Sequence, residues 1–351
     1  MLPTPFLFCA YAVARLSVSL GRRVGLVDHP DEARKQHSGA IALTGGIGIF
    51  ATILLGTFAL DIAPYTYSML AIACVVFAIG VFDDFHHINP WLRLAIQYGC
   101  GIALATFGGI AIVNVGNLLG MGDIPLLLLG VPLTALSVAG LSNAYNMIDG
   151  IDGLAASTIT LPLALLYVLA LKAGHPMADS LLLMLVPLAV FLCFNLGPNN
   201  AWLPKMFLGD GGSITLGFLV TASLVYFSQG ENALIEPVTA LWLVTLPLMD
   251  MLATMLRRFK HGRKLMEADR SHLHHTLMDV LGLGSRQTLA ILMLGALACA
   301  VSGLALEQFP AYVSMFFYFI LFGAHCAFVM KAEKIAKRLR ERRVSRRMKR
   351  A

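Results

Sequence analysis

Charged residues are scarce in this chain. Only 13% of its 351 residues are Asp, Glu, Lys or Arg, whereas 58% are hydrophobic. Soluble domains carry about 25% charged residues, so the composition argues against a soluble enzyme and indicates a membrane protein. The six cysteines all fall in apolar segments without CxxC spacing, which argues against a disulfide framework and a cysteine metal site. The sequence also lacks a convincing internal repeat, and this absence weakens an interpretation as a transporter.

Long apolar segments recur along the sequence at the length that a membrane-spanning helix needs, which is about 17–25 residues. A spanning segment must pair its backbone groups internally, so we expect helices. The sequence therefore predicts an all-α polytopic membrane protein with about eleven transmembrane helices. The predicted spans are residues 4–20, 41–60, 65–82, 94–113, 124–145, 154–171, 180–196, 212–229, 236–256, 287–306 and 311–330. Residues 1–330 are expected to form a single multispan domain, followed by a basic tail at 331–351.

Basic residues are distributed unevenly between the two sides of this topology. Of the 26 Lys and Arg residues, 24 fall in the loops and tail of one side, whereas Lys172 is alone on the other. Cytoplasmic loops carry the excess of Lys and Arg, so we expect a periplasmic N-terminus and a cytoplasmic C-terminus. The first apolar segment has no basic residue before it and no cleavage site, so it is expected to be a retained span. The basic tail favours attraction to anionic lipid over nucleic-acid binding.

Four polar clusters interrupt the apolar segments, and all four fall on the predicted cytoplasmic side. They are Asp83-Asp84, residues 143–154, residues 207–212 and residues 272–275. Ionisable groups at the edge of a bilayer are costly without partners and so indicate function. Because these clusters played no part in the count of basic residues, their shared location predicts a single active site.

The first two clusters are rich in oxygen ligands. The adjacent carboxylates of Asp83 and Asp84 repel each other unless a cation or a proton lies between them. Asn146, Asp149 and Asp152 follow at intervals of three, and such side chains suit Mg²⁺, which takes one or two carboxylates together with substrate phosphates. The alternatives are two solvated acids at a helix end and an ordinary polar turn between spans.

The other two clusters favour phosphate binding. Asp210 lies where an apolar span begins, and a helix N-terminus attracts phosphate oxygens, although a simple N-cap is the alternative. Arg270 is followed closely by His272, His274 and His275, a spacing that does not match zinc sites. Arg and His side chains in this arrangement suit phosphate better than metal.

Three local features complete the sequence prediction. A short helix is expected around Ser271–Gly282 in the long basic loop, and turns or a short hairpin are expected at Ile110–Ile124. Asp250, in the inner half of a span, is interpreted as a buried structural acid paired with Arg257 or Arg258.

Together these motifs resemble the polyprenyl-phosphate N-acetylhexosamine-1-phosphate transferase family, glycosyltransferase family 4. The resemblance covers about residues 25–286, with all four clusters in family order. Residues 247–250 and 270–275 are most similar to the WecA-type branch. Its members transfer GlcNAc-1-phosphate from UDP-GlcNAc to undecaprenyl phosphate, the initiating step of O-antigen and enterobacterial-common-antigen synthesis. His87 stands where the family often has the last Asp of a DDxxD motif, so it stays outside the expected catalytic set.

The resemblance implies a role for each of thirteen residues. It implies Mg²⁺, with Mn²⁺ as an alternative, held by Asp210 and Asn146. It implies a catalytic set consisting of Asp83, Asp84 and Asp149, with Asp83 nearest the attacking lipid phosphate. It implies contacts to the uracil from Asp152 and Phe207. The remaining implied substrate contacts, to phosphates and sugar, come from Arg93, Lys35, Arg270, His272, His274 and His275.

The partners implied by the resemblance are UDP-GlcNAc, undecaprenyl phosphate and membrane lipid, with no nucleic acid; a homodimer is compatible with the sequence. The implied location is the bacterial inner membrane, with the active site facing the cytoplasm. Direct attack by the lipid phosphate is preferred over a covalent aspartyl intermediate. Within the family, UDP-MurNAc-pentapeptide or another UDP-N-acetylhexosamine is the alternative donor. An ion-coupled transporter is the alternative of another class, although its acids should lie near the bilayer midplane.

Overall fold

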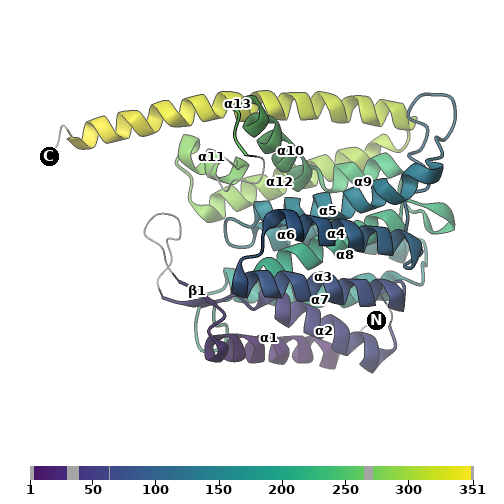
Figure 1. Cartoon of the computed structure of the whole chain (residues 1–351), viewed down its shortest axis with the longest axis horizontal. Helices are drawn as coiled ribbons and strands as arrows, with labels where there is room; N and C mark the ends of the chain where they lie inside the picture. Colours follow the sequence, from purple (N-terminus) through teal and green to yellow (C-terminus); the bar gives the residue numbers. More distant parts are fainter. Residues whose placement is uncertain (1–3, 30–38, 63, 265–271, 349–351) are drawn as a thin grey trace.

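Most helices of this protein lie side by side along one common direction (Figure 1). This computed structural model describes residues 4–29, 39–62, 64–264 and 272–348. The sequence predictions for Lys35 and Arg270 lie outside the described residues. Two short strands, β1 (Val27–Asp28) and β2 (Ile41–Ala42), pair antiparallel.

The helices account for nearly all of the regular structure in the described residues. In chain order they are α1 (Thr4–Val24), α2 (Gly45–Leu60), α3 (Tyr67–His86), α4 (Pro90–Thr106), η1 (Leu127–Leu129), α5 (Gly130–Ile148), α6 (Leu154–Lys172), α7 (Ala178–Leu196), α8 (Asp210–Tyr226), η2 (Gly230–Asn232), α9 (Pro237–Leu243), α10 (Thr245–Lys260), α11 (Leu273–Leu281), α12 (Ser285–Leu306) and α13 (Ala311–Met348). The predicted all-α fold is thereby confirmed, and α11 confirms the helix expected in the basic loop.

Seven of these helices are long and apolar enough to cross a membrane, or eight if the bent pair α9–α10 is one span. Each of the eleven predicted apolar segments nevertheless falls on a helix or on this pair. The difference lies mainly in α2, α4 and α8, which have only 16, 17 and 17 residues. A helical membrane protein is therefore established, and the number eleven stays a prediction.

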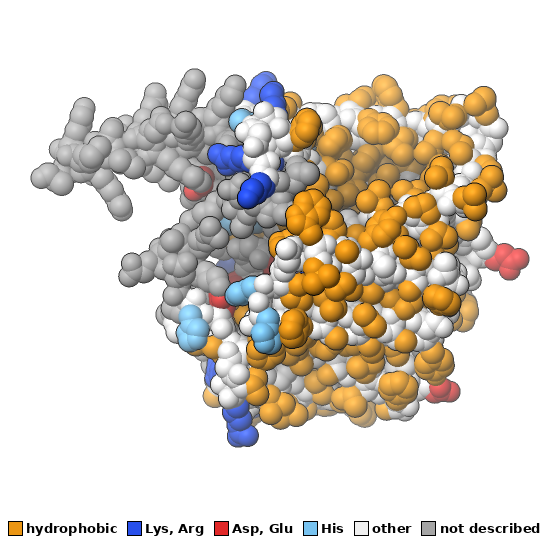
Figure 2. All heavy atoms as spheres, in the orientation of Figure 1, with side chains coloured by type: hydrophobic (Ala, Val, Ile, Leu, Met, Phe, Trp, Pro, Cys, Tyr) orange, Lys and Arg blue, Asp and Glu red, His pale blue; other side chains and the backbone are white. Residues whose placement is uncertain are grey.

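The outside of the bundle is apolar around its middle and charged at its ends (Figure 2). Large side chains such as Phe58, Leu128 and Phe316 are 72%, 92% and 62% exposed. Water would not favour so many exposed apolar groups, whereas lipid chains would. In the view of Figure 2, Lys, Arg and His side chains gather at the left end and acidic side chains stand at the right edge.

Helix α8 is buried along almost its whole length, from Gly211 to Val225. It contacts α2, α3, α5 and α6, and it carries no charged side chain after Asp210. A helix that is apolar on all sides belongs in an interior. A Cβ added at Gly46 would lie 2.2 Å from the Cα of Gly212, so only glycine lets α2 pack this closely on the start of α8. This packing fixes where Asp210 lies.

The predicted span at 236–256 falls on a bent pair of helices rather than on one continuous helix. The axes of α9 and α10 differ by 81°. Pro247 supplies a physical reason, because in a continuous helix its ring would clash with the carbonyl of residue i−4. That residue is Leu243, where α9 ends. The turn region expected at Ile110–Ile124 is confirmed, since the Val115 amide donates to the carbonyl of Ile124 at 3.2 Å.

Candidate functional site

The end of α3, the start of α4, the end of α5 and the start of α8 meet at one end of the bundle. Asp84 of α3 accepts hydrogen bonds from the amides of Asp210 and Gly211, at 2.7 and 2.9 Å. The N-cap position of α8 is Gly209, whose φ of 74° suits glycine and whose side chain cannot cap. Asp84 therefore caps α8 from another helix, and Asp210 is the first helical residue rather than the N-cap.

Arg93, in the first turn of α4, connects the acids of this site. Its Nη1 lies 2.5 Å from Asp83 Oδ2 and 3.3 Å from Asp210 Oδ2. Its Nη2 donates to the side-chain oxygens of Asn143 and Asn146, each at 3.3 Å. The buried Nε of Arg93 has no hydrogen-bond partner among the residues that the structure describes. A guanidinium has five donor hydrogens, so Arg93 keeps capacity for a further anion.

The two predicted metal ligands lie next to each other. Nδ2 of Asn146 donates to Asp210 Oδ1 at 2.7 Å and to Ser213 Oγ at 3.1 Å. Among the described residues no group of three or more His, Cys, Asp or Glu side chains is arranged to hold a metal. One carboxylate and one amide, completed by water and substrate phosphates, is nevertheless a donor set that suits Mg²⁺. The residues present fit the predicted ion.

Asp149 follows the last residue of α5, so the helical spacing considered for residues 146–152 does not continue past Ile148. Desolvation, together with the charges of Asp210, Asp84 and Asp152, raises the pKa of Asp149 to about 7, although the residue as a whole is exposed at the surface. Its carboxyl group is close enough to the other acids for their charges to repel.

The raised pKa of Asp149 predicts a pH-dependent stability. The folded protein holds this proton up to about pH 7, whereas the unfolded chain releases it near pH 3.8. The folded state thus binds more protons, and the contribution to stability is lost as pH rises through the folded pKa. In EDTA, the unfolding midpoint of Asp149→Asn relative to the native protein should rise between pH 5 and 8. Parallel pH profiles for the two proteins would contradict the shifted pKa.

The histidine cluster packs against the acidic site through α11. Nδ1 of His272 lies 3.0 Å from Asp250 Oδ2, and the amide of Leu273 donates to Asp250 Oδ1 at 2.8 Å. The structure thus pairs Asp250 with His272, whereas the sequence prediction named an arginine. His274 lies against Gly150, since a Cβ added there would stand 2.2 Å from its Nε2. The rings of His274 and His275 have centroids 4.2 Å apart.

Asp152 and Phe207 share a partner that the sequence analysis missed. Nζ of Lys205 lies 2.5 Å from Asp152 Oδ2 and 5.7 Å from the centroid of the Phe207 ring. Gln97, one turn after Arg93 on α4, was also missed and accepts from Asn143 Nδ2 at 2.5 Å. The spacing of Gln97 from Arg93 was the available signal, because residues four apart share a helix face.

His87, which departs from the family's acidic motif, is exposed and ends α3 in the left-handed conformation, with φ 49°.

The structure brings together at one end of the bundle the predicted residues that it describes. These are Asp83, Asp84, Arg93, Asn146, Asp149, Asp152, Phe207, Asp210, His272, His274 and His275.

Comparison with known proteins finds relatives along nearly the whole chain. A family model described as glycosyl transferase family 4 matches residues 66–228. An Escherichia coli K12 protein named undecaprenyl-phosphate alpha-N-acetylglucosaminyl 1-phosphate transferase is 34% identical over 99% of this chain and 93% of its own length. Proteins of the same name from Yersinia pestis and Haemophilus influenzae are 32% and 34% identical, over 99% and 92% of this chain and 93% and 92% of their own.

Proposed function

Because the chain belongs to glycosyl transferase family 4 and is a membrane transferase, we propose that it transfers GlcNAc-1-phosphate from UDP-GlcNAc to undecaprenyl phosphate. The observation that carries the proposal is the position of Arg93, which contacts Asp83 and Asp210 and also Asn143, a residue that lines an apolar cavity. The relatives' shared name supports the acceptor and the sugar. The resulting lipid-linked sugar would initiate a polysaccharide of the O-antigen or enterobacterial-common-antigen type.

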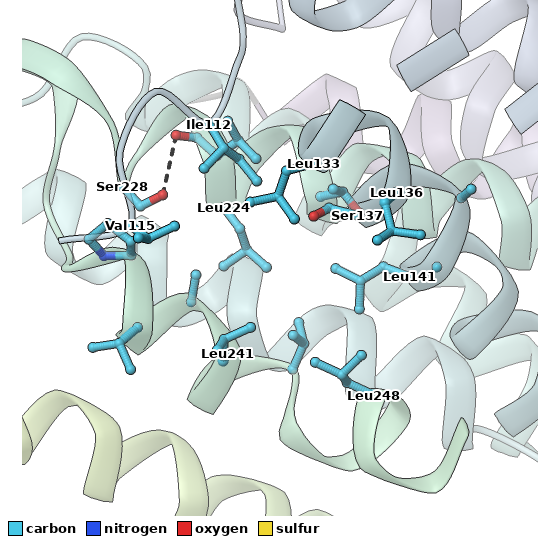
Figure 3. A pocket seen from close by; sticks show the side chains of 18 of the residues that line it. Ile112, Val115, Leu133, Leu136, Ser137, Leu141, Leu224, Ser228, Leu241 and Leu248 are labelled. Carbon is cyan, nitrogen blue, oxygen red and sulfur yellow. Dashed lines mark hydrogen bonds between the residues drawn. The ribbon is translucent and has the colours of Figure 1, made fainter. Parts of the chain in front are cut away.

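The cavity supports a polyprenyl acceptor. It has a volume of about 550 Å³ and lies between α5, α8 and the bent pair α9–α10 (Figure 3). Its lining includes Asn143, a partner of Arg93, and Leu94, the neighbour of Arg93. Toward the opposite end of the bundle it reaches Val115 and Gln229. An acceptor could thus place its phosphate at Arg93 and its isoprenoid chain among leucines such as Leu133, Leu136, Leu141, Leu224, Leu241 and Leu248.

The polar site supports a nucleotide-sugar donor. Asp210 and Asn146 would hold Mg²⁺, which when bound neutralises charge on the diphosphate and stabilises the departing UMP. Phe207 would stack on the uracil, and Asp152 would accept its N3–H. His272, fixed by Asp250, and His274 would face the sugar and diphosphate from α11.

The reaction that this arrangement supports is an in-line phosphoryl transfer. An oxygen of the lipid phosphate attacks the β-phosphorus of UDP-GlcNAc, the bond to the α-phosphate oxygen breaks, and UMP leaves. A phosphate monoester has a second pKa near 6, so it is largely deprotonated at neutral pH and needs no strong base. Phosphoryl transfer depends mainly on positioning and charge neutralisation. For the attacking phosphate, Arg93 would supply the positive charge, and Asp83 and Asn143 would hold Arg93 in place. Direct attack therefore suffices.

We also propose that the polar end of the bundle faces the cytoplasm, with eleven spans and the N-terminus outside. The basic loops and tail support this orientation. The other end is acidic, since the amide of Glu236 donates to Glu307 at 2.9 Å and Asp123 lies close enough to repel Glu236. A site at the polar end would meet UDP-sugars in the bacterial cytoplasm.

The proposed roles predict different kinetic defects for Phe207 and Asp83. Phe207→Ala should mainly raise the KM for UDP-GlcNAc, by about 5–150-fold, because a stacking contact is worth about 1–3 kcal/mol. Asp83→Asn should lower kcat and leave UDP-GlcNAc binding largely intact, because Asp83 holds Arg93 at the acceptor side. Steady-state kinetics and isothermal titration measure the two effects. Loss of nucleotide binding in Asp83→Asn, with normal binding in Phe207→Ala, would reverse the assignment.

A further inference from the structure

Lys205 lies beside Asp152 and Phe207, the two residues that contact the nucleotide base in the proposed function. Its Nζ is 2.5 Å from Asp152 Oδ2, and it stands over the ring of Phe207 at 5.7 Å from the centroid. The side chains of Lys205 and Asp152 are 22% and 36% exposed. The pair is thus open to a ligand on one side and held by protein on the other.

The backbone around Lys205 is fixed independently of this ion pair. The amide of Lys205 donates to Asn199 Oδ1 at 2.9 Å, and Nδ2 of Asn195 donates to the carbonyl of Met206 at 2.9 Å. The amide of Phe207 donates to the carbonyl of Ala42 in β2, also at 2.9 Å. The loop therefore does not need the Lys205–Asp152 ion pair to hold its shape, and a partly exposed ion pair adds little stability.

We propose that Lys205 and Asp152 act together to select uracil as the base of the donor, an inference that rests on the proposed function. The carboxylate can only accept a hydrogen bond, and the neighbouring ammonium group can only donate. Uracil presents the complementary pattern, an N3–H donor beside carbonyl acceptors. With the base in the same register, cytosine would present its N3 acceptor to Asp152 and its 4-amino donor to Lys205, so both contacts would fail. Lys205 is thereby a specificity-determining residue, and Phe207 supplies stacking that does not distinguish the two bases.

Equilibrium binding of UMP and CMP to the purified full-length protein in detergent tests this inference without any acceptor lipid. The native protein should prefer UMP. Lys205→Met should weaken UMP binding by about 10–100-fold, as expected for a hydrogen bond to a charged group, and change CMP binding much less. Lys205→Arg should keep most of the preference because it still donates. Lys260→Met, at the exposed end of α10, removes the same charge away from Asp152 and should leave both affinities unchanged.

The ratio of the dissociation constants for CMP and UMP decides whether Lys205 selects the base, because this ratio does not depend on how much of a preparation is folded. A Lys205→Met protein that keeps the native preference for UMP, with or without a lower unfolding midpoint, would show that the pair is only a structural bridge and would overturn the inference. A native protein that binds neither UMP nor UDP-GlcNAc would instead overturn the proposed function on which it rests.

Discussion

Asp210→Asn should lower turnover by about 100-fold or more while the protein remains folded, because a cation at this site would lose its carboxylate ligand. Asp210 Oδ1 already lies within hydrogen-bond distance of Asn146, and its backbone amide is held by Asp84. The isosteric change keeps these contacts and removes one negative charge. The measurement is the initial rate of UMP release as a function of Mg²⁺ concentration, in which the variant should require far more Mg²⁺.

Asp179→Asn is the matched control for this prediction. Asp179 is exposed in the first turn of α7, so the same isosteric change occurs at a helix start away from the polar site. Its rate and Mg²⁺ requirement should equal those of the native protein. A native rate for Asp210→Asn at saturating Mg²⁺ would remove Asp210 from the ligand set.

Arg93→Met should abolish most activity and also destabilise the protein. Arg93 is the cation between Asp83 and Asp210, and its side chain is 15% exposed. Removing one partner from a buried charge pair costs about 3–5 kcal/mol, because the remaining carboxylates face each other without compensation. The rate of product formation and the unfolding midpoint measure the two effects. Added Mg²⁺ should restore part of the midpoint, since a divalent cation can replace the lost positive charge, but should not restore turnover.

Two further variants bracket this result. Arg93→Lys keeps the charge but cannot form the forked contacts to Asp83, Asp210, Asn143 and Asn146, so its turnover should be intermediate. Arg286→Met removes a charge from an exposed residue at the start of α12 and should behave like the native protein. If Arg93→Met were as active as Arg286→Met, the proposed placement of the acceptor phosphate would be wrong.

The sequence was sufficient to predict the helices because hydropathy acts locally. Each predicted apolar segment falls on a helix or on the bent pair, and α11 lies where a helix was expected in the long basic loop. The bend between α9 and α10 was not predicted, although Pro247 lies close to it. A proline is an ambiguous signal, because Pro162 and Pro187 lie inside helices that continue through them. A proline alone therefore does not determine where a membrane helix breaks, and the packing around it decides.

The residues that the structure brings together in the candidate site were predictable from the sequence, but their pairings were not. Polar side chains in apolar surroundings indicated Asp83, Asn146 and Asp210, since their cost requires a function. The capping of α8 by Asp84 depends on the close packing of α3 on α8, which no local pattern encodes. Lys205 was counted only as a basic residue, because its meaning comes from Asp152, 53 positions earlier in the chain.

The central claim is that this protein joins a sugar phosphate to a polyprenyl phosphate, and a single assay tests it most directly. Purified protein in detergent receives undecaprenyl phosphate, Mg²⁺ and each of several UDP-N-acetylhexosamines, including UDP-GlcNAc and UDP-MurNAc-pentapeptide. We predict equal amounts of UMP and undecaprenyl-diphospho-GlcNAc by mass spectrometry, fastest with UDP-GlcNAc and without any membrane gradient. Absence of UMP release from every donor, in protein that remains folded, would contradict the account.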